Sequence, residues 1–195
     1  MALSEKIKEA IRHAKIPFFI SIGIYFLGFI AGIFLFYFFD PNAPGTKIFD
    51  ILPGVLKTDP TTMAFVKNNG TVILILVSGS LFLGLTTFIS LSLNGLVFGV
   101  AMAASMQNAS LTTVLLFTMP HAIFELPSMW FAGAAGFKIP YELIRYFTNK
   151  KEYILNKEEA MDFLTLIGIA IVLVLIAALV EANFTMGIGE TFNRL

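Results

Sequence analysis

Long stretches without a charged side chain are the feature that most constrains how this chain can fold. Residues 16–39 are uninterrupted apolar sequence, and residues 71–105 carry no charge at all. A helix of about 24 residues is roughly 36 Å long, which is enough to cross a hydrocarbon core of about 30 Å with some tilt. The sequence therefore predicts an all-α fold, a polytopic transmembrane helical bundle that forms one integral membrane domain over 1–195.

The composition agrees with a membrane protein and excludes other classes. The chain is 57% hydrophobic and 13% charged, whereas soluble domains are about half apolar and about a quarter charged. The net charge is zero, so nothing indicates a nucleic-acid partner. Because the chain has no cysteine, it can form neither a disulfide framework nor a thiolate metal site. The lipid bilayer is therefore the first partner that we expect.

Five membrane spans, some of them short or broken, account for the apolar stretches. As a single helix, residues 71–105 would be roughly 52 Å long, so we expect a break among the polar residues from Thr86 to Asn94. Pro120 removes a helical hydrogen bond and is expected to kink or break its span. The predicted spans are 16–39, 71–89, 92–106, 111–137 and 160–182.

Positive charge predicts which side of the membrane each segment faces. Residues 1–15 form a basic amphipathic pattern, either an interfacial helix or a plain cytoplasmic flank, and residues 138–159 form a polar connector. Together these two segments hold nine Lys and Arg residues, and the opposite side of a five-span arrangement holds four. We therefore expect a multi-pass protein of the cell membrane with a cytoplasmic N-terminus. A second interfacial helix is predicted over 48–56.

Three polar side chains lie within apolar sequence, where a polar group is costly unless it has a partner or a function. They are Asn94, His121 and Glu125. His121 and Glu125 are four residues apart and hence share one helix face. They fit a hydrogen-bonded pair, part of a proton or ion path, or metal ligands, although zinc needs three or four ligands and the only other histidine is His13. Asn94 either meets this pair across a helix interface or forms an Asn-Gly turn. We assign no metal, cofactor or catalytic residue.

Small residues and prolines accompany this polar group. The predicted spans contain two small-xxx-small pairs, a spacing that can seat a neighbouring helix. The pairs are Gly28 with Gly32 and Gly95 with Gly99. Pro120 and Pro127 bracket the two ionisable residues. We therefore assign these prolines to helix kinks and the glycines to helix packing.

Three motifs follow one another along the chain. They are Lys67-Asn68-Asn69 before a Gly-rich apolar run, Leu93-Asn94-Gly95 with Gly99, and Pro120-His121 with Glu125-Leu126-Pro127. Over residues 65–185 this order resembles the stage II sporulation protein M family of bacterial and archaeal integral membrane proteins. One departure is Ala122, where the family commonly has glycine. By position, the resemblance carries the family motif onto Asn94, Gly95, His121 and Glu125.

The resemblance implies a non-enzymatic membrane protein. In spore-forming bacteria the family member is a membrane scaffold for two peptidoglycan-remodelling enzymes, stage II sporulation proteins D and P, during engulfment. Most relatives belong to organisms that make no spores, so sporulation is not predicted for this chain. We expect a scaffold or membrane-assembly factor that contacts other membrane or envelope proteins. The alternatives are a small channel or transporter that uses His121 and Glu125, and an intramembrane metalloenzyme. The sequence is compatible with a homo-oligomer and with a monomer.

Overall fold

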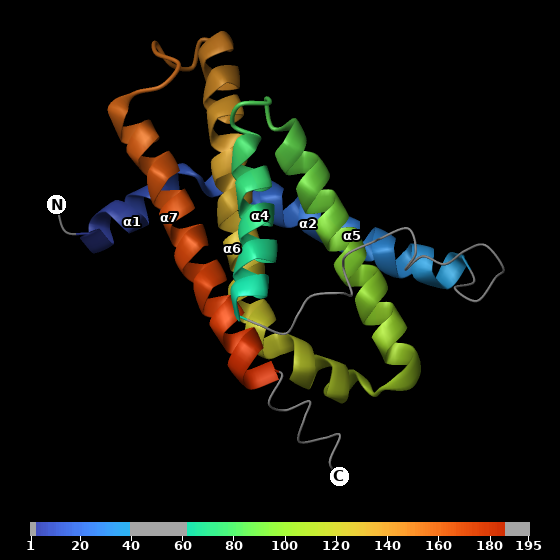
Figure 1. The fold of residues 1–195 in the computed structure, drawn as a ribbon. Helices are drawn as coiled ribbons and strands as arrows, with labels where there is room; N and C mark the ends of the chain where they lie inside the picture. Colours follow the sequence, from blue (N-terminus) through green and yellow to red (C-terminus); the bar gives the residue numbers. More distant parts are fainter. Residues whose placement is uncertain (1–2, 40–61, 186–195) are drawn as a thin grey trace.

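Residues 3–39 and 62–185 are described by the computed structural model, and within these ranges every regular element is a helix (Figure 1). In chain order the elements are α1 (Leu3–His13), α2 (Lys15–Phe38), α4 (Thr62–Ser78), α5 (Leu85–Asn108), α6 (Leu111–Phe147), α7 (Lys157–Val180) and the short π-helix η1 (Glu181–Thr185). The predicted all-α fold class is therefore confirmed. The interfacial helix predicted over 48–56 lies outside the described residues.

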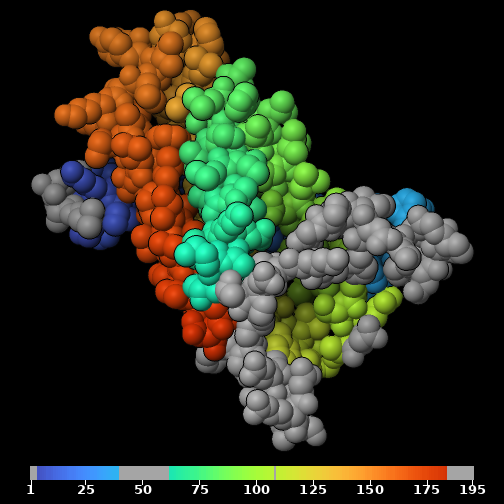
Figure 2. Space-filling model, viewed as in Figure 1, coloured from blue at the N-terminus to red at the C-terminus, as the bar shows by residue number. Residues whose placement is uncertain are grey.

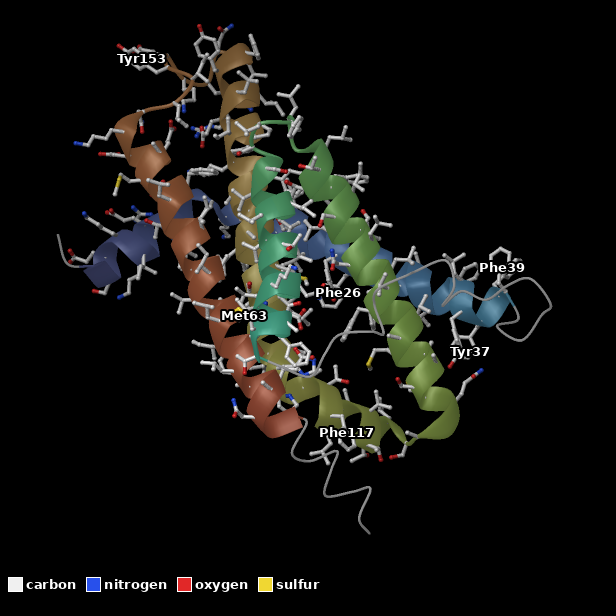
Figure 3. The ribbon with its side chains drawn as sticks, viewed as in Figure 1. Phe26, Tyr37, Phe39, Met63, Phe117 and Tyr153 are labelled. Atoms are coloured by element: carbon white, nitrogen blue, oxygen red, sulfur yellow. The ribbon has the colours of Figure 1, made fainter. Side chains whose placement is uncertain are left out.

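Four of the helices, α2, α5, α6 and α7, are long and apolar enough to cross a membrane. Helix α4 is also apolar but has 17 residues, roughly 25 Å, which is the short end of the range for a membrane span. Large apolar side chains cover much of the outer surface, and Figure 3 shows Tyr37 and Phe39 pointing away from the bundle at the end of α2. An exposed apolar surface of this extent is typical of a protein that lies in a membrane.

The chain reverses between α4 and α5 in a turn over residues 79–84, which lies before the break predicted within 86–94. Gly84 has a φ of 84°, a left-handed backbone that glycine adopts without steric cost. The polar residues that suggested a later break lie inside α5. The hydroxyl of Thr87, for example, donates a 2.7 Å hydrogen bond to the carbonyl of Leu76 on α4. The predicted position is wrong because Ser and Thr residues that join two helices by hydrogen bonds look the same in the sequence as Ser and Thr residues in a loop.

Helix α6 contains three prolines and is nevertheless continuous from Leu111 to Phe147. Pro120 lies inside this helix, so the chain does not break before His121. Figure 1 shows that α6 changes direction in its first half, as expected where a proline removes a hydrogen bond and its ring displaces the preceding turn. The prolines are therefore compatible with a bent helix, and the alternative of a break at Pro120 is wrong.

Helix α6 also extends beyond the predicted end of its span, so the predicted connector 138–159 is too long. The connector between α6 and α7 comprises only residues 148–156. Helix α7 starts earlier than predicted because Asn156 and Glu159 form a capping box, in which each side chain accepts a hydrogen bond from the backbone N–H of the other, at 2.8 and 2.9 Å. Charged residues that the sequence assigned to a polar connector thus belong to packed helices.

Helices α2 and α5 cross where the two glycine pairs of the sequence face each other. A Cβ atom at Gly28 or Gly32 would overlap a backbone carbonyl oxygen of α5, and one at Gly95 or Gly99 would overlap a carbonyl oxygen of α2. The two backbones are therefore in direct contact, and any larger residue would force them apart. Figure 1 shows the oblique crossing, with α2 behind α5.

Small residues of α6 fill the centre of the bundle. Ala134 and Ala135 are fully buried and pack with Leu166 of α7 and with Ala14, which joins α1 to α2. A hydrogen bond also joins α6 to α7, since the hydroxyl of Ser128 donates to the carbonyl of Ala170 at 3.0 Å. Figure 2 shows α1 lying against the side of α7.

Candidate functional site

Asn94 lies in the middle of α5 and is satisfied by its own helix. Its Nδ2 donates to the carbonyl of Ser90 at 2.8 Å and to the hydroxyl of the same residue at 3.3 Å. Asn94 therefore forms no Asn-Gly turn, and among the described residues no hydrogen bond joins it to His121 or Glu125. The amide serves instead as a polar group that is paired locally within a span.

His121 and Glu125 lie one turn apart in the bent half of α6 and are both half-buried. Within the described ranges no hydrogen bond or ion pair joins the two side chains to each other. Glu125 interacts electrostatically with two residues of other elements, Glu181 on η1 and Tyr25 on α2. These interactions link Glu125 to residues of α2 and η1 that were not part of the predicted polar group.

Aromatic rings pack beside this group at the contact between α2 and α6. The ring of Tyr25 meets the indole of Trp130 edge-on, with 6.3 Å between ring centroids, and Phe26 lies 6.0 Å from the same indole. Trp130 Nε1 is buried, and within the described ranges no hydrogen-bond acceptor faces it. The contact is thus held by ring packing and not by polar pairing.

A group of charged residues, which we call the charged cluster, lies at the opposite end of α7 from Glu181. Its members are His13, Lys138, Glu142, Arg145, Lys151, Glu159 and Asp162. At its centre Lys138 is fully buried, with its Nζ 3.3 Å from the Asp162 carboxylate and 3.9 Å from that of Glu142. Both carboxylates are also buried. A buried ammonium group needs such partners, because moving an unpaired ion from water into the protein interior costs on the order of several kcal/mol.

The 148–156 connector closes the charged cluster from the outside. Lys151 donates to the Glu142 carboxylate at 3.0 Å and to Glu159 of α7, and Arg145 donates to Glu142 at 3.0 Å. Burial works to lower the pKa of Lys151, but its hydrogen bonds to Glu159 and Glu142 outweigh burial, so the pKa is raised. Three cations and three carboxylates therefore neutralise one another here, aside from His13.

His13 attaches α1 to the same cluster. Its Nδ1 lies 2.9 Å from the Asp162 carboxylate, the same oxygen that binds Lys138. The neighbouring Ala14 is fully buried, so α1 is held by a polar contact and by close packing together. The charged cluster thus joins α1, α6, α7 and the connector, which places both of the predicted basic segments at one end of the molecule.

Two pockets on the surface lie away from the predicted polar residues. One, of about 640 Å³, lies over the end of α6 and the connector, and the other, of about 430 Å³, lies between α1 and α7. Neither is lined by Asn94, His121 or Glu125. Among residues 3–39 and 62–185, no group of three His, Cys, Asp or Glu side chains is arranged to hold a metal ion.

Sequence reasoning missed the charged cluster, although one local signal was present. Lys138 and Glu142 are spaced four residues apart, as an intrahelical ion pair requires, within a segment of amphipathic pattern. Their third partner, Asp162, is on another helix and 24 residues further along the chain. A hydropathy pattern assigns these charged residues to an aqueous connector, so the ion pair of Lys138 with Glu142 was not predicted.

Comparison with known proteins identifies the family. A family model described as "Stage II sporulation protein M" matches residues 21–186. An uncharacterised protein of Methanocaldococcus jannaschii is 36% identical over 172 residues, which cover 88% of this chain and 94% of that protein. No solved structure matches the chain. The matched range is longer than the 65–185 of the motif resemblance and includes both glycine pairs, the predicted polar residues and nearly all of the charged cluster. The chain therefore belongs to the stage II sporulation protein M family.

Proposed function

We propose that the protein is a non-enzymatic scaffold or assembly factor of the cell membrane. The observation that supports this function best is the charged cluster, in which buried Lys138, Glu142 and Asp162 hold α1, α6 and α7 together. Removing one partner of a buried ion pair costs about 3–5 kcal/mol, so this end of the bundle favours a single arrangement. A scaffold needs such a fixed frame, whereas a transporter needs elements with two arrangements.

The partners in this proposal are other membrane or envelope proteins, and α2 is the surface offered to them. Of the four helices long enough to cross a membrane, α2 is the least covered by the rest of the chain, with 17% of its span buried. It is held in place by the glycine crossing, and it exposes a row of large side chains that includes Leu27, Ile30 and Phe34. A helix fixed on one side and open on the other can receive a transmembrane helix of a partner.

Photo-crosslinking in the native membrane tests this scaffold. A photoreactive phenylalanine analogue at Phe34, which is 62% exposed, is expected to yield a discrete adduct with one membrane or envelope protein. The same analogue at Phe36, which is buried against α5, serves as the matched control and is expected to crosslink only within the chain. Adducts with lipid alone at Phe34 contradict the proposed partner surface, and adducts with a second copy of the chain replace it with a homo-oligomer.

A small channel or transporter is the second candidate, and a specific arrangement favours it. The carboxylates of Glu125 on α6 and Glu181 on η1 interact electrostatically, and η1 is a π-helix, a feature frequent at functional sites. Paired carboxylates within a membrane are typical of cation or proton paths. If wild-type proteoliposomes conduct cations and Glu125→Gln abolishes the flux without altering gel filtration, this candidate replaces the scaffold.

We also infer that the end of the molecule with α1 and the connector faces the cytoplasm. Both basic segments meet in the charged cluster, so they share one side of the membrane, and the positive-inside rule favours the cytoplasm. Because the chain has no cysteine, single reporters at Glu152 or Ser4 can be labelled cleanly. A membrane-impermeant maleimide added to intact cells is expected to label neither reporter until the membrane is opened. Labelling of both in intact cells reverses the orientation.

A further inference from the structure

The groove between α1 and α7 is lined by His13 and Asp162 of the charged cluster and by further residues that the proposed function does not use. It has a volume of about 430 Å³ and is formed by one face of α1 and by the first turns of α7. Three cationic side chains line it, Lys6 and Arg12 from α1 and Lys157 from α7, and two carboxylates, Glu9 and Glu158, lie among them. The groove thus presents both signs of charge from two separate helices.

The outer charges of the groove are available to a ligand, whereas the inner ones are already paired. Asp162, which forms part of its inner wall, is already paired with Lys138 and His13 and is buried. By contrast, within the described ranges no ion pair involves Lys6, Arg12 or Lys157. A phosphate accepts strong charge-assisted hydrogen bonds from Arg and Lys, and a nearby ammonium group would pair with the two carboxylates of the lining. A headgroup that carries both a phosphate and an amine matches this lining better than a purely anionic one.

A row of exposed positions, mostly apolar, continues from the groove along the surface of α7. Met161 lines the groove and is exposed, and the exposed positions that follow on the same side of α7 are Leu164, Gly168 and Val172. A Cβ atom at Gly168 would meet nothing within 4 Å, so the helix surface is lowest at this position. Positions three or four residues apart stack along one face of a helix, and this row leads from the charged turn of α7 into its apolar span.

We propose that this groove binds one phospholipid with a phosphate-and-amine headgroup. The phosphate lies between Arg12, Lys6 and Lys157, the amine faces Glu9 and Glu158, and one acyl chain runs past Met161 over Gly168. The site lies where the charged first turn of α7 gives way to apolar sequence, which is the level of lipid headgroups in a membrane. The bound lipid also bridges α1 to α7, and the site does not depend on whether the protein is a scaffold or a transporter.

Native mass spectrometry of the full-length protein, released from detergent in the presence of added lipid, tests the site. Phosphatidylethanolamine, phosphatidylglycerol and phosphatidylcholine with the same acyl chains are the probes, and soluble phosphorylethanolamine is the competitor. We expect phosphatidylethanolamine to bind best to the wild type. The double variant Lys6→Gln/Arg12→Gln is expected to bind it about tenfold more weakly, since two charge-assisted contacts are lost.

Matched controls separate the groove from a general effect of charge or surface. The double variant Lys8→Gln/Lys150→Gln removes the same charge from exposed residues outside the groove and is expected to bind like the wild type. Gly168→Leu places a large side chain in the path of the acyl chain and is expected to weaken binding, whereas Gly23→Leu, at another glycine with open surroundings on α2, leaves binding unchanged. All four charged residues are exposed, so none of the charge substitutions removes core packing.

Three outcomes overturn the proposal. The first is equal binding of phosphatidylglycerol and phosphatidylethanolamine, which removes the role of the amine. The second is equal loss of binding in the groove variant and the matched charge control. The third is full displacement of the lipid by phosphorylethanolamine at matched concentration, which assigns the groove to a soluble ligand with no acyl chain.

Discussion

The glycine crossing of α2 with α5 and the charged cluster of α1, α6 and α7 hold the same small bundle together by opposite means. At the crossing no side chain separates the two backbones, and each of the four glycines faces a carbonyl oxygen of the other helix. In the charged cluster long side chains fill the space between helices, and Lys138 is buried among carboxylates. The glycine crossing is therefore disrupted by an added side-chain atom, whereas the charged cluster is disrupted by the removal of a charge.

The difference follows from where each contact lies along the helices. Between apolar spans the hydrophobic effect does not draw helices together, so association depends on close packing of small residues. At the charged end of α7, ionised groups can be retained because the partners are present at hydrogen-bond distance and the connector closes over them. Shape thus specifies one half of the fold, and charge pairing specifies the other.

The largest effect is expected from removing the central cation of the charged cluster. Lys138→Met leaves the buried carboxylates of Asp162 and Glu142 without their shared cation, which is expected to cost about 3–5 kcal/mol of unfolding free energy. Unfolding in mixed micelles with increasing SDS measures the loss. Lys150→Met, an exposed lysine in the connector, is the control and is expected to change stability little. A loss below about 1 kcal/mol in Lys138→Met would mean that the cluster is solvated.

A single added methyl group tests the crossing. Gly32→Ala places a Cβ against a backbone carbonyl oxygen, which cannot move aside as a flexible side chain would. We expect a destabilisation of about 1–3 kcal/mol by the same unfolding assay, the range for overpacking. Gly23→Ala on the same helix has open space around its Cβ position and is expected to be neutral or slightly stabilising. Equal stability of the two variants contradicts a direct contact between backbones.

The outer part of the charged cluster is expected to matter less than its centre. Arg145 pairs with Glu142 at 3.0 Å, but its side chain is 39% exposed. Exposed ion pairs contribute about 0–1 kcal/mol, so Arg145→Gln is expected to lie within that range and to become indistinguishable from the wild type at high salt. A loss as large as that of Lys138→Met would place Arg145 among the residues that hold the cluster together.

The smallest effect is a loss of stability at high pH. The pKa of Lys151 is raised in the folded protein, because hydrogen bonds to Glu159 and Glu142 outweigh its burial. A group with a raised pKa stabilises the fold fully below its unfolded value, about 10.4 for lysine, and the contribution disappears as pH rises through the folded value. Melting temperature is therefore expected to fall more steeply above about pH 10 in the wild type than in Lys151→Met. Parallel curves for the two proteins contradict this role.

The sequence was sufficient to predict the fold class, but not the position of the turn. The length of an uncharged run reflects the length of helix that crosses a membrane. A four-residue spacing of glycines reflects the close packing of two helices. Thr87 shows why the turn was misplaced: its hydroxyl bonds to Leu76 on the preceding helix, and that partner is visible only once the helices are paired. Pro120 is a second example, because a bend and a break in α6 both result from the same missing backbone hydrogen bond and cannot be distinguished from the sequence.

The candidate site was harder to predict because its partners come from distant segments. Asn94 bonds within its own helix, and Glu125 interacts electrostatically with Glu181, which follows α7. Lys138 and Asp162 are brought together by the hairpin of α6 and α7. A hydropathy pattern assigns every charged residue to an aqueous segment. It therefore cannot distinguish a lysine in a loop from a lysine whose charge is neutralised by carboxylates within a helical bundle.

Trp130 packs against Tyr25 and Phe26 where α2 meets α6, and it is the single tryptophan of the chain. Its emission therefore comes from one known place, the junction that must open if α2 leaves the bundle. The fluorescence of Trp130 therefore reports on this junction without an added label. A red shift of its emission during unfolding shows when α2 separates from α6, independently of the loss of helical circular dichroism.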